Sequence, residues 1–290
     1  MVTCGLILLA RLQSYHNMAN FINKICGVTS TGIAKVLSPN YSATNKINSI
    51  LDNKYSIDFD GSGDYIDAST SADNMSTATG TVCVWAELDG ASNNEAIFEC
   101  SIGTSGNNKI MIKYVSASNL WRGQYKANTG GSVVTKSADY TQDNSTCIAA
   151  GWQHFAMTWD TGTADEIKLY VNGSLEDTEG TITHFNGTPD RVHLGKAANA
   201  SHTYHDGQID NFALWTSVLT AAEITAIYNV RNPDFTAAFT DTAGNTYNSH
   251  GDLIQWLRML ENTGTSLADS SGNSNTASIT NAAWIAKPAF

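Results

Sequence analysis

The chain has 290 residues, of which 42% are hydrophobic and only 15% are charged, and its formal net charge is −11. Chains of about 200 to 250 residues commonly form one β-sandwich or barrel, so one main domain with flanking segments is expected. The negative charge repels phosphate backbones and anionic lipid surfaces, and the sequence has no basic cluster with interleaved aromatic residues. Nucleic acid and membranes are therefore excluded as expected partners, whereas cations are favoured.

The N-terminal segment, residues 1–50, lacks the pattern of a folded core. Its apolar run, Leu6 to Ala10, is ended by Arg11 and is shorter than the roughly 7 to 15 apolar residues of a signal peptide. The remainder is rich in small residues and has no sustained hydrophobic period. We expect residues 1–50 to form an arm or docking segment.

From Tyr55 onward the pattern changes to short strands separated by Gly, Asn, Asp and Ser. Apolar and polar residues alternate in "TVCVWAEL" (81–88), "QHFAMTW" (153–159) and "EIKLYV" (166–171). No helical pattern separates these strands. We therefore expect an all-β domain over residues 51–230, with two antiparallel sheets packed face to face.

One short helix is predicted at the end of this region. In "TAAEITAIYN", Thr220 and Glu223 have the spacing of a capping box just ahead of apolar residues at helical spacing. Pro233 then marks a boundary. Residues 231–290 contain a short apolar piece and a Ser/Asn/Gly-rich stretch, so we expect an ordered C-terminal extension rather than a second core.

The five cysteines are odd in number and far apart in the sequence, with no CxxC motif. Unpaired cysteine usually behaves as a small hydrophobic residue. Free, mostly buried thiols are therefore predicted for Cys4, Cys26, Cys83, Cys100 and Cys147.

Three blocks in order resemble the laminin G-like jelly roll of the concanavalin A-like lectin and glucanase superfamily. They are "YSIDFDGSGDYIDAS", "GWQHFAMTWDTGTADEIKLYVNGSLEDTEG" and "VHLGKAANASHTYHDGQIDNFALWTSVLTAAEITAIYN". The resemblance spans about residues 51–230 and implies a jelly-roll β-sandwich. It does not fix the function, because this sandwich is found in lectins, adhesion modules, enzymes and virion parts.

The terminal segments carry a second, compositional resemblance. The tail "LIQWLRMLENTGTSLADSSGNSNTASITNAAW" and the segment before Tyr55 resemble segments that accompany such domains in structural proteins of tailed bacterial viruses. This resemblance implies a location on the virion surface.

A structural calcium ion is predicted from aspartates in two of the three blocks. In "GQIDNFALW", Asp210 has the parity of Phe212 and Leu214, so it should face inward and need a partner. Asp60 and Asp64 lie in a Gly-bearing loop from which oxygens can converge on a hard cation. Asp60 or Asp64 together with Asp210 would hold the ion, similar to calcium sites of some relatives. Alternatively, Asp210 accepts backbone N–H bonds.

No catalytic constellation is found in the sequence. His154 in "GWQHF" has no neighbouring acid to orient it, so a structural histidine is favoured. Glu95 and Glu99 would share one strand face but lie about 13 Å apart, too far for a retaining glycosidase pair. The E-x-D-x-x-E order of laminarinase-type relatives is also absent. We therefore expect no enzyme activity.

Candidate sugar-binding residues are the aromatic side chains near predicted turns. Trp121 and Tyr125 in "NLWRGQY", and Tyr204 with His205 in "SHTYHDG", could form a stacking platform for a glycan. The alternative is that these rings cover the ends of the sandwich.

These observations favour a non-enzymatic, lectin-like structural protein of a tailed bacterial virus, as a capsid decoration or tail-associated protein. Its expected partners are other virion proteins and cell-surface glycans, in an oligomeric or assembly-bound state. The alternative is a secreted bacterial carbohydrate-binding or adhesion module located outside the cell. A glycan-cleaving enzyme is the third hypothesis.

Overall fold

The structure is a computed structural model that describes residues 55–286, except 91–93, 105, 186, 199–203 and 232. The chain divides into two units, Met1–Asn53 and Lys54–Phe290, and only the second contains described residues. The predicted arm, residues 1–50, and the thiols of Cys4 and Cys26 therefore lie outside the described residues.

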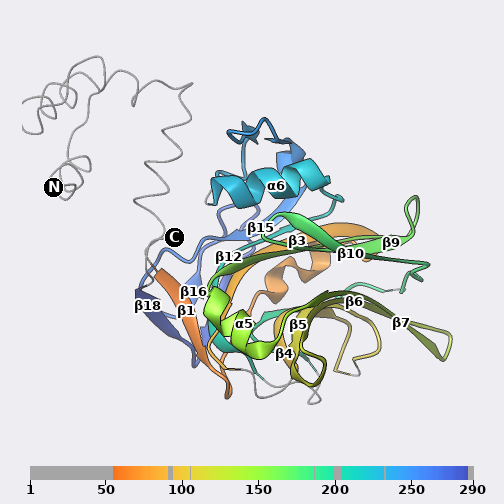
Figure 1. Cartoon of the computed structure of the whole chain (residues 1–290), viewed down its shortest axis with the longest axis horizontal. Helices are drawn as coiled ribbons and strands as arrows, with labels where there is room; N and C mark the ends of the chain where they lie inside the picture. Colours follow the sequence, from red (N-terminus) through yellow and green to blue (C-terminus); the bar gives the residue numbers. More distant parts are fainter. Residues whose placement is uncertain are drawn as a thin grey trace, which may run out of the picture. The chain divides into compact units, whose positions relative to one another are not determined.

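Two eight-stranded sheets form the layers of the domain (Figure 1), and every described strand pair in them is antiparallel, as predicted. The first sheet contains, in spatial order, β10 (Ser174–Gly180), β9 (Glu166–Val171), β8 (Gln153–Asp160), β3 (Thr79–Leu88), β12 (Asp206–Trp215), β1 (Tyr55–Asp60) and β18 (Ala283–Ala286), with β15 (Leu253–Leu257) also paired to β12. The second sheet contains β16 (Ser266–Leu267), β17 (Ala277–Thr280), β2 (Tyr65–Asp67), β11 (Arg191–Leu194), β4 (Asn94–Ser101), β5 (Lys109–Val115), β6 (Leu120–Thr129) and β7 (Ser132–Thr141).

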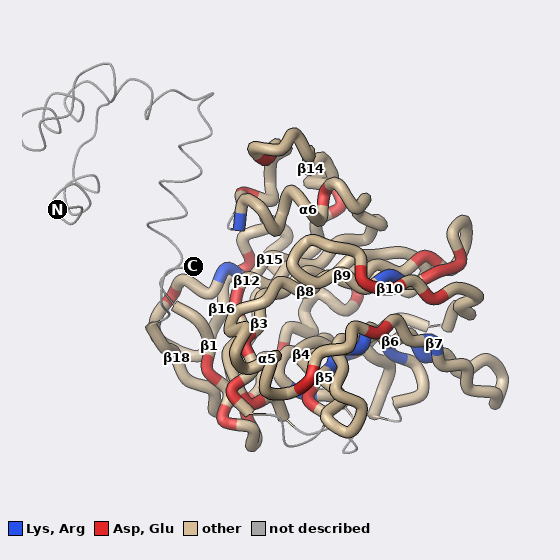
Figure 2. Tube along the Cα trace, viewed as in Figure 1, with Lys and Arg blue, Asp and Glu red and all other residues tan. Residues whose placement is uncertain are grey.

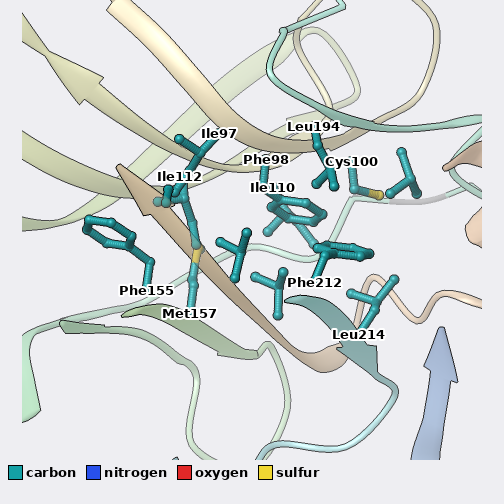
Figure 3. Close-up of a cluster of buried hydrophobic side chains, with 14 of the residues drawn as sticks. Ile97, Phe98, Cys100, Ile110, Ile112, Phe155, Met157, Leu194, Phe212 and Leu214 are labelled. Carbon is teal, nitrogen blue, oxygen red and sulfur yellow. The ribbon is translucent and has the colours of Figure 1, made fainter. Parts of the chain in front are cut away.

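Alternate side chains of both sheets meet between the layers and form the inter-sheet core. Figure 3 shows Phe98, Ile110 and Ile112 of the second sheet facing Met157 and Phe212 of the first. The predicted alternation in β3, β8 and β9 is confirmed, because every second residue of these strands is buried in this core, namely Val82, Val84, Phe155, Met157, Ile167 and Leu169. Full burial of each such side chain contributes about 1.5 to 3 kcal/mol.

The predicted capping-box helix is also present, as α6 (Ala221–Val230). The Thr220 hydroxyl accepts a hydrogen bond from the Glu223 backbone N–H, and the Glu223 carboxylate accepts one from Thr220 N–H. The helix packs Ile224 and Ile227 against Trp215 on the outer side of the first sheet (Figure 1). The first sheet is therefore covered on both faces.

Shorter helical elements have weaker sequence signals. The helix α5 (Asn144–Ala150) begins after Asp143, whose carboxylate accepts a hydrogen bond from Thr146 N–H. Its seven residues are too few to show a helical period, and it was not predicted. The remaining elements are the 3-10 helices η1 (Ser69–Asn74), η2 (Ser116–Ser118) and η3 (Ser249–Asp252), and the hairpin of β13 (Phe239–Thr240) and β14 (Thr246–Tyr247).

The segment predicted as a C-terminal extension is part of the sandwich. It supplies β15 and β18 to the first sheet and β16 and β17 to the second. The "DSSGN" stretch is organised by Asp269, whose carboxylate accepts hydrogen bonds from the N–H groups of Trp256, Ser271 and Asn275. The predicted boundary after residue 230 is therefore not a structural boundary.

A β-bulge in β12 changes the predicted orientation of Asp210. The register of β12 against β3 shifts between Asp210 and Ala213, and Asn211 has φ of +48°. Ile209 and Phe212 are both in the inter-sheet core, so Asp210 faces the outer side of the first sheet. The prediction that Asp210 faces inward with Phe212 is wrong, because one extra residue between them reverses the alternation.

The three described cysteines, Cys83, Cys100 and Cys147, are free and buried, as predicted. Burial raises the pKa of the Cys147 thiol to about 11, despite a hydrogen bond from the Trp121 indole. Within the described ranges, no helix is both long enough and apolar enough to span a bilayer.

Replacing Glu223 with alanine is expected to destabilise the domain by about 2 to 4 kcal/mol, because buried donors would lose their acceptor. The carboxylate also accepts hydrogen bonds from Asn248 N–H, Ser249 N–H and the Ser249 hydroxyl, which tie α6 to the C-terminal segment. Urea unfolding at pH 7 measures the loss. The control is Glu176→Ala on the exposed side of β10, whose free energy of unfolding should lie within about 0.5 kcal/mol of the parent's. An equal loss of stability in both variants would contradict the role given to the Glu223 hydrogen bonds.

Candidate functional site

Three residues of β5 and three of β6 project away from the inter-sheet core. The residues between them, among them Ile110, Ile112 and Tyr125, are buried in that core. The outward set, which we call the β5–β6 face, consists of Lys109, Met111, Lys113, Arg122, Gln124 and Lys126. Five of these six side chains are polar or charged, on a sheet whose other face is apolar.

The antiparallel register pairs these residues across the two strands. Lys109 lies opposite Lys126, and Lys113 lies opposite Arg122. Met111 lies opposite Gln124, between the two cationic pairs. Directly opposed residues have Cβ atoms about 4.5 to 5.5 Å apart, so each pair presents its two side chains together.

The neighbouring strands add carboxylates at the edges of the β5–β6 face. Glu99 of β4 accepts a hydrogen bond from the Lys109 ammonium at 3.3 Å and another from Ala198 N–H at 2.7 Å. Asp139 of β7 binds the Arg122 guanidinium through two hydrogen bonds of 2.7 Å. Such bidentate pairs fix the orientation of the guanidinium.

Positive charge is in excess on the β5–β6 face, although the chain as a whole is acidic. Figure 2 shows Lys and Arg along β6 and its neighbours, whereas Asp and Glu recur near β1 and β12. Burial, and then repulsion by Lys109 and Arg122, lower the pKa of Lys113 to about 8.

The predicted aromatic platform is not present on this surface. Trp121 and Tyr125 are each 1% exposed, because they occupy inward positions of β6 rather than a turn. His205 is fully buried, with Nε2 3.1 Å from the Glu87 carbonyl oxygen. These three rings cannot stack on a sugar in this fold. Tyr204 is half-buried, next to residues 199–203, which are not described.

Comparison with known proteins identifies the family. A family model described as "Concanavalin A-like lectin/glucanases superfamily", of the laminin G type, matches residues 60–225, more than half of the chain. The chain belongs to the concanavalin A-like lectin/glucanases superfamily. This confirms the family and fold predicted from the three sequence blocks.

Individual relatives of this superfamily member are distant. Human adhesion G-protein coupled receptor D1 is 32% identical over 109 residues, which cover 34% of this chain and 11% of the receptor. A "putative carbohydrate binding protein" from Bacteroides ovatus aligns with a TM-score of 0.51 and 15% identity, over 81% of this chain and 60% of that chain. The sialidase module CBM40 from Ruminococcus gnavus aligns with a TM-score of 0.47 and 17% identity, over 60% of this chain and 96% of the module. At 15% identity the match to the Bacteroides ovatus protein shows the fold alone.

The aspartates predicted to bind calcium do not form a cation site. Asp60 pairs with Asp206 at one end of β12, whereas Asp210 lies four residues further along, about 13 Å away. Asp60 and Asp64 instead accept backbone hydrogen bonds, from Ser62 N–H and Asp60 N–H respectively. Across the part of the chain that the structure describes, no three His, Cys, Asp or Glu side chains are arranged to hold a metal ion.

The acidic residues at that end of the sandwich repel one another. Burial, followed by repulsion from Asp89, Asp64 and Asp206, raises the pKa of Asp58 above its usual value. Burial and the neighbouring Glu95 likewise raise the pKa of Asp206. The charged form of Asp58 therefore destabilises the fold at neutral pH.

The geometry of the two candidate catalytic glutamates differs from the prediction. A bulge between Ala96 and Phe98 of β4 reverses the alternation, so Glu95 and Glu99 lie on opposite faces of the sheet rather than on one. Glu95 is fully buried and accepts a hydrogen bond from Asp206 N–H at 3.1 Å. Glu99 belongs to the edge of the β5–β6 face. These two carboxylates cannot flank one glycosidic bond.

His154 is a core residue, as the sequence favoured. Its ring packs beside Trp85 and Tyr228, with centroids 5.2 and 6.2 Å away. Among the described residues, neither ring nitrogen has a hydrogen-bond partner, and complete burial lowers the pKa of His154 to about 3. A neutral imidazole without an acid beside it has no partner for proton transfer.

Asp58→Asn is expected to stabilise the protein at pH 7, by less than about 1 kcal/mol because the group is partly solvated. The gain should shrink in high salt and vanish below pH 3.8, where the carboxyl is protonated in both the folded and unfolded states. Thermal unfolding of the parent and of Asp58→Asn at two salt concentrations measures this gain in stability. Asp73→Asn, at an exposed position of η1, is the control; the same gain there would argue against mutual repulsion at the sandwich end.

His154 is expected to make the protein less stable as the pH falls. The unfolded imidazole binds a proton below about pH 6.5, whereas the folded one stays neutral until about pH 3. Stability is therefore lost from pH 6.5 downward, by about 2 kcal/mol at pH 5. Urea unfolding at pH 7 and pH 5 measures this loss of stability. The loss should be absent from His154→Phe and retained in His250→Gln, which alters an exposed histidine. If the stability of His154→Phe depended on pH as that of the parent does, the loss could not be attributed to His154.

Proposed function

We propose that this protein is a non-enzymatic carbohydrate-binding module and that the glycan binds on the β5–β6 face. The observation that carries the proposal is the alignment of the partly exposed Arg122 and Lys126 of β6 beside Asp139 of β7, held in register by the inter-sheet core. Sugar hydroxyls are recognised by such fixed donors and acceptors. The Bacteroides ovatus protein, whose name refers to carbohydrate binding, has the same fold and supports this proposal.

The face offers both hydrogen-bond donors and acceptors. Gln124 donates to the Ser137 hydroxyl at 3.3 Å and has an amide oxygen that can accept from a sugar hydroxyl. Arg122 and Asp139 are partly exposed, with 27% and 31% of their side-chain surface accessible. A bound sugar ring can therefore contact the Arg122–Asp139 pair and the partly exposed Lys126, whereas Met111 is fully buried and does not contribute a contact.

The absence of enzyme activity is part of the proposal. The superfamily contains glucanases, which makes hydrolysis the relevant alternative. Canonical glycoside hydrolysis requires two carboxylates facing one sugar. On the β5–β6 face, Glu99 and Asp139 are committed to Lys109 and Arg122, and Glu95 lies on the other side of the sheet.

The proposed setting is outside the cell, as a secreted or surface-bound adhesion module of the kind considered in the sequence analysis. The virion location and virion partners remain predictions from the terminal segments. None of the three relatives named above is a virion protein, and the arm at residues 1–50 lies outside the described residues.

A glycan array probed with the full chain is expected to show binding, and Gln124→Ala should weaken the affinity about tenfold through loss of a polar contact. The matched control is Thr178→Ala, at an exposed position of β10 in the first sheet, which should bind as the parent does. Chromatography of the incubated glycans should show no cleavage products. Binding that is insensitive to Gln124→Ala would place the site elsewhere, and cleavage would overturn the non-enzymatic part.

A further inference from the structure

We infer that α6 is an acid-released cover of the first sheet, and that protonation of His154 beneath it is the event that releases it. The opening is local, because α6 leaves the outer side of the sheet while the inter-sheet core stays packed. This opening involves no glycan contact, so it goes beyond the proposed function.

His154 lies under α6, between aromatic rings of two elements. It is 1% exposed and stands opposite Trp85 in the β3–β8 register, and its ring centroid is 6.2 Å from that of Tyr228 on α6. Trp85 and Tyr228 are themselves stacked, with centroids 5.8 Å apart. In the part of the chain that the structure describes, neither nitrogen of His154 has a hydrogen-bond partner. A proton on this ring would therefore be a buried charge among aromatic side chains, which is costly.

The charged groups around His154 do not offset this cost. The titratable side chains that the surrounding elements direct to the outer side of the first sheet are Glu87 of β3, Glu166, Lys168 and Tyr170 of β9, Asp210 of β12, and Glu223 and Tyr228 of α6. Burial alone lowers the pKa of His154 to about 3. The closed form therefore excludes the proton over the whole range in which a hydrated imidazole binds one.

Two separate clusters of buried hydrophobic side chains allow a local opening. The inter-sheet core contains the inward residues of both sheets, among them Cys100 and Phe155. The outer cluster joins α6 to the other side of the first sheet (Figure 1), where Ile224, Ala226 and Ile227 pack with Cys83, Ala213 and Trp215. The apolar side chains of α6 belong to the outer cluster. Its departure would therefore expose Cys83 without separating the two sheets.

The contacts that hold α6 closed differ in their response to acid. The Thr225 hydroxyl donates to the Gly173 carbonyl oxygen at 3.0 Å, and this bond has no titratable group. Burial opposes ionisation of Glu223, but hydrogen bonds from Ser249 and Thr220 lower its pKa below the usual 4.5. The Glu223 carboxylate therefore stays charged between pH 7 and pH 5, and its contribution is lost only at lower pH. In this range His154 is the group that controls α6.

Acid shifts the equilibrium toward the open form. The imidazole of the open form is hydrated and binds a proton below about pH 6.5, whereas that of the closed form stays neutral until about pH 3. The closed form is therefore fully favoured above pH 6.5 and loses this advantage as the pH falls. Between pH 7 and pH 5 the equilibrium constant for opening should rise about 25-fold.

Thiol labelling of the full chain at pH 7 and pH 5 tests the inference, because the chain supplies its own reporters. Cys83 lies in the outer cluster that α6 covers, and Cys100 lies in the inter-sheet core. The probe is dithiodipyridine, which also reacts with thiols in acid, and peptide mass spectrometry identifies the labelled cysteine. Relative to glutathione in the same buffer, Cys83 should be labelled about 25-fold faster at pH 5 than at pH 7, whereas Cys100 should stay protected.

His154→Phe is the diagnostic variant, because its ring cannot take up a proton. Its Cys83 labelling should not respond to acid, whereas the matched control His250→Gln, at an exposed position of η3, should respond as the parent does. Unfolding curves at pH 7 check that both variants are folded, and the comparison of Cys83 with Cys100 in the parent needs no variant.

Three outcomes would overturn the inference. Labelling of Cys83 that is no faster at pH 5 would show that acid does not release α6. Equal acceleration at Cys83 and Cys100 would show unfolding of the whole domain rather than a local opening. Acceleration that persists in His154→Phe would assign the response to another group. Hydrogen exchange of the α6 amides, corrected for the intrinsic effect of pH, measures the same opening without a reagent.

Discussion

Burial of every second side chain between the two sheets is the constraint on which the rest of the structure depends. On β5 and β6 it orients Ile110, Ile112 and Tyr125 inward, and thereby directs Lys109, Lys113 and Lys126 outward. A shift of one residue in register would exchange the two sets, placing lysines in the core at a cost of several kcal/mol each. The candidate binding face is therefore as rigid as the core behind it, which favours preorganised recognition of a ligand.

The two sheets are used differently. The first is covered on its outer side by α6 and the C-terminal segment, whose Phe235, Tyr247 and Trp256 pack with Trp215. Glu223 connects the start of α6 to this segment through hydrogen bonds. The second sheet has a polar outer side over β5 and β6. The two outer sides therefore differ in composition, because the second carries Lys, Arg and Gln side chains where the first packs aromatic rings.

Like charges lie close together in two regions of the domain. Aspartates around Asp58 and Asp206 repel one another at one end of the sandwich, whereas cations repel one another on the β5–β6 face. The net charge of −11 gives the whole chain a negative field, which is screened beyond about 8 Å at physiological ionic strength.

The sequence by itself determined the features that depend on neighbours along the chain. Alternation identified β3, β8 and β9, the T-x-x-E spacing identified the start of α6, and the ordered blocks identified the superfamily. Tertiary structure decided the rest. The bulges at Asn211 and at Ala96–Phe98 reversed the faces of Asp210, Glu95 and Glu99, and Trp121 and Tyr125 proved to be core residues of a strand. Lys109 and Lys126 became neighbours only through the β5–β6 register, because cross-strand pairing joins residues that no local pattern relates.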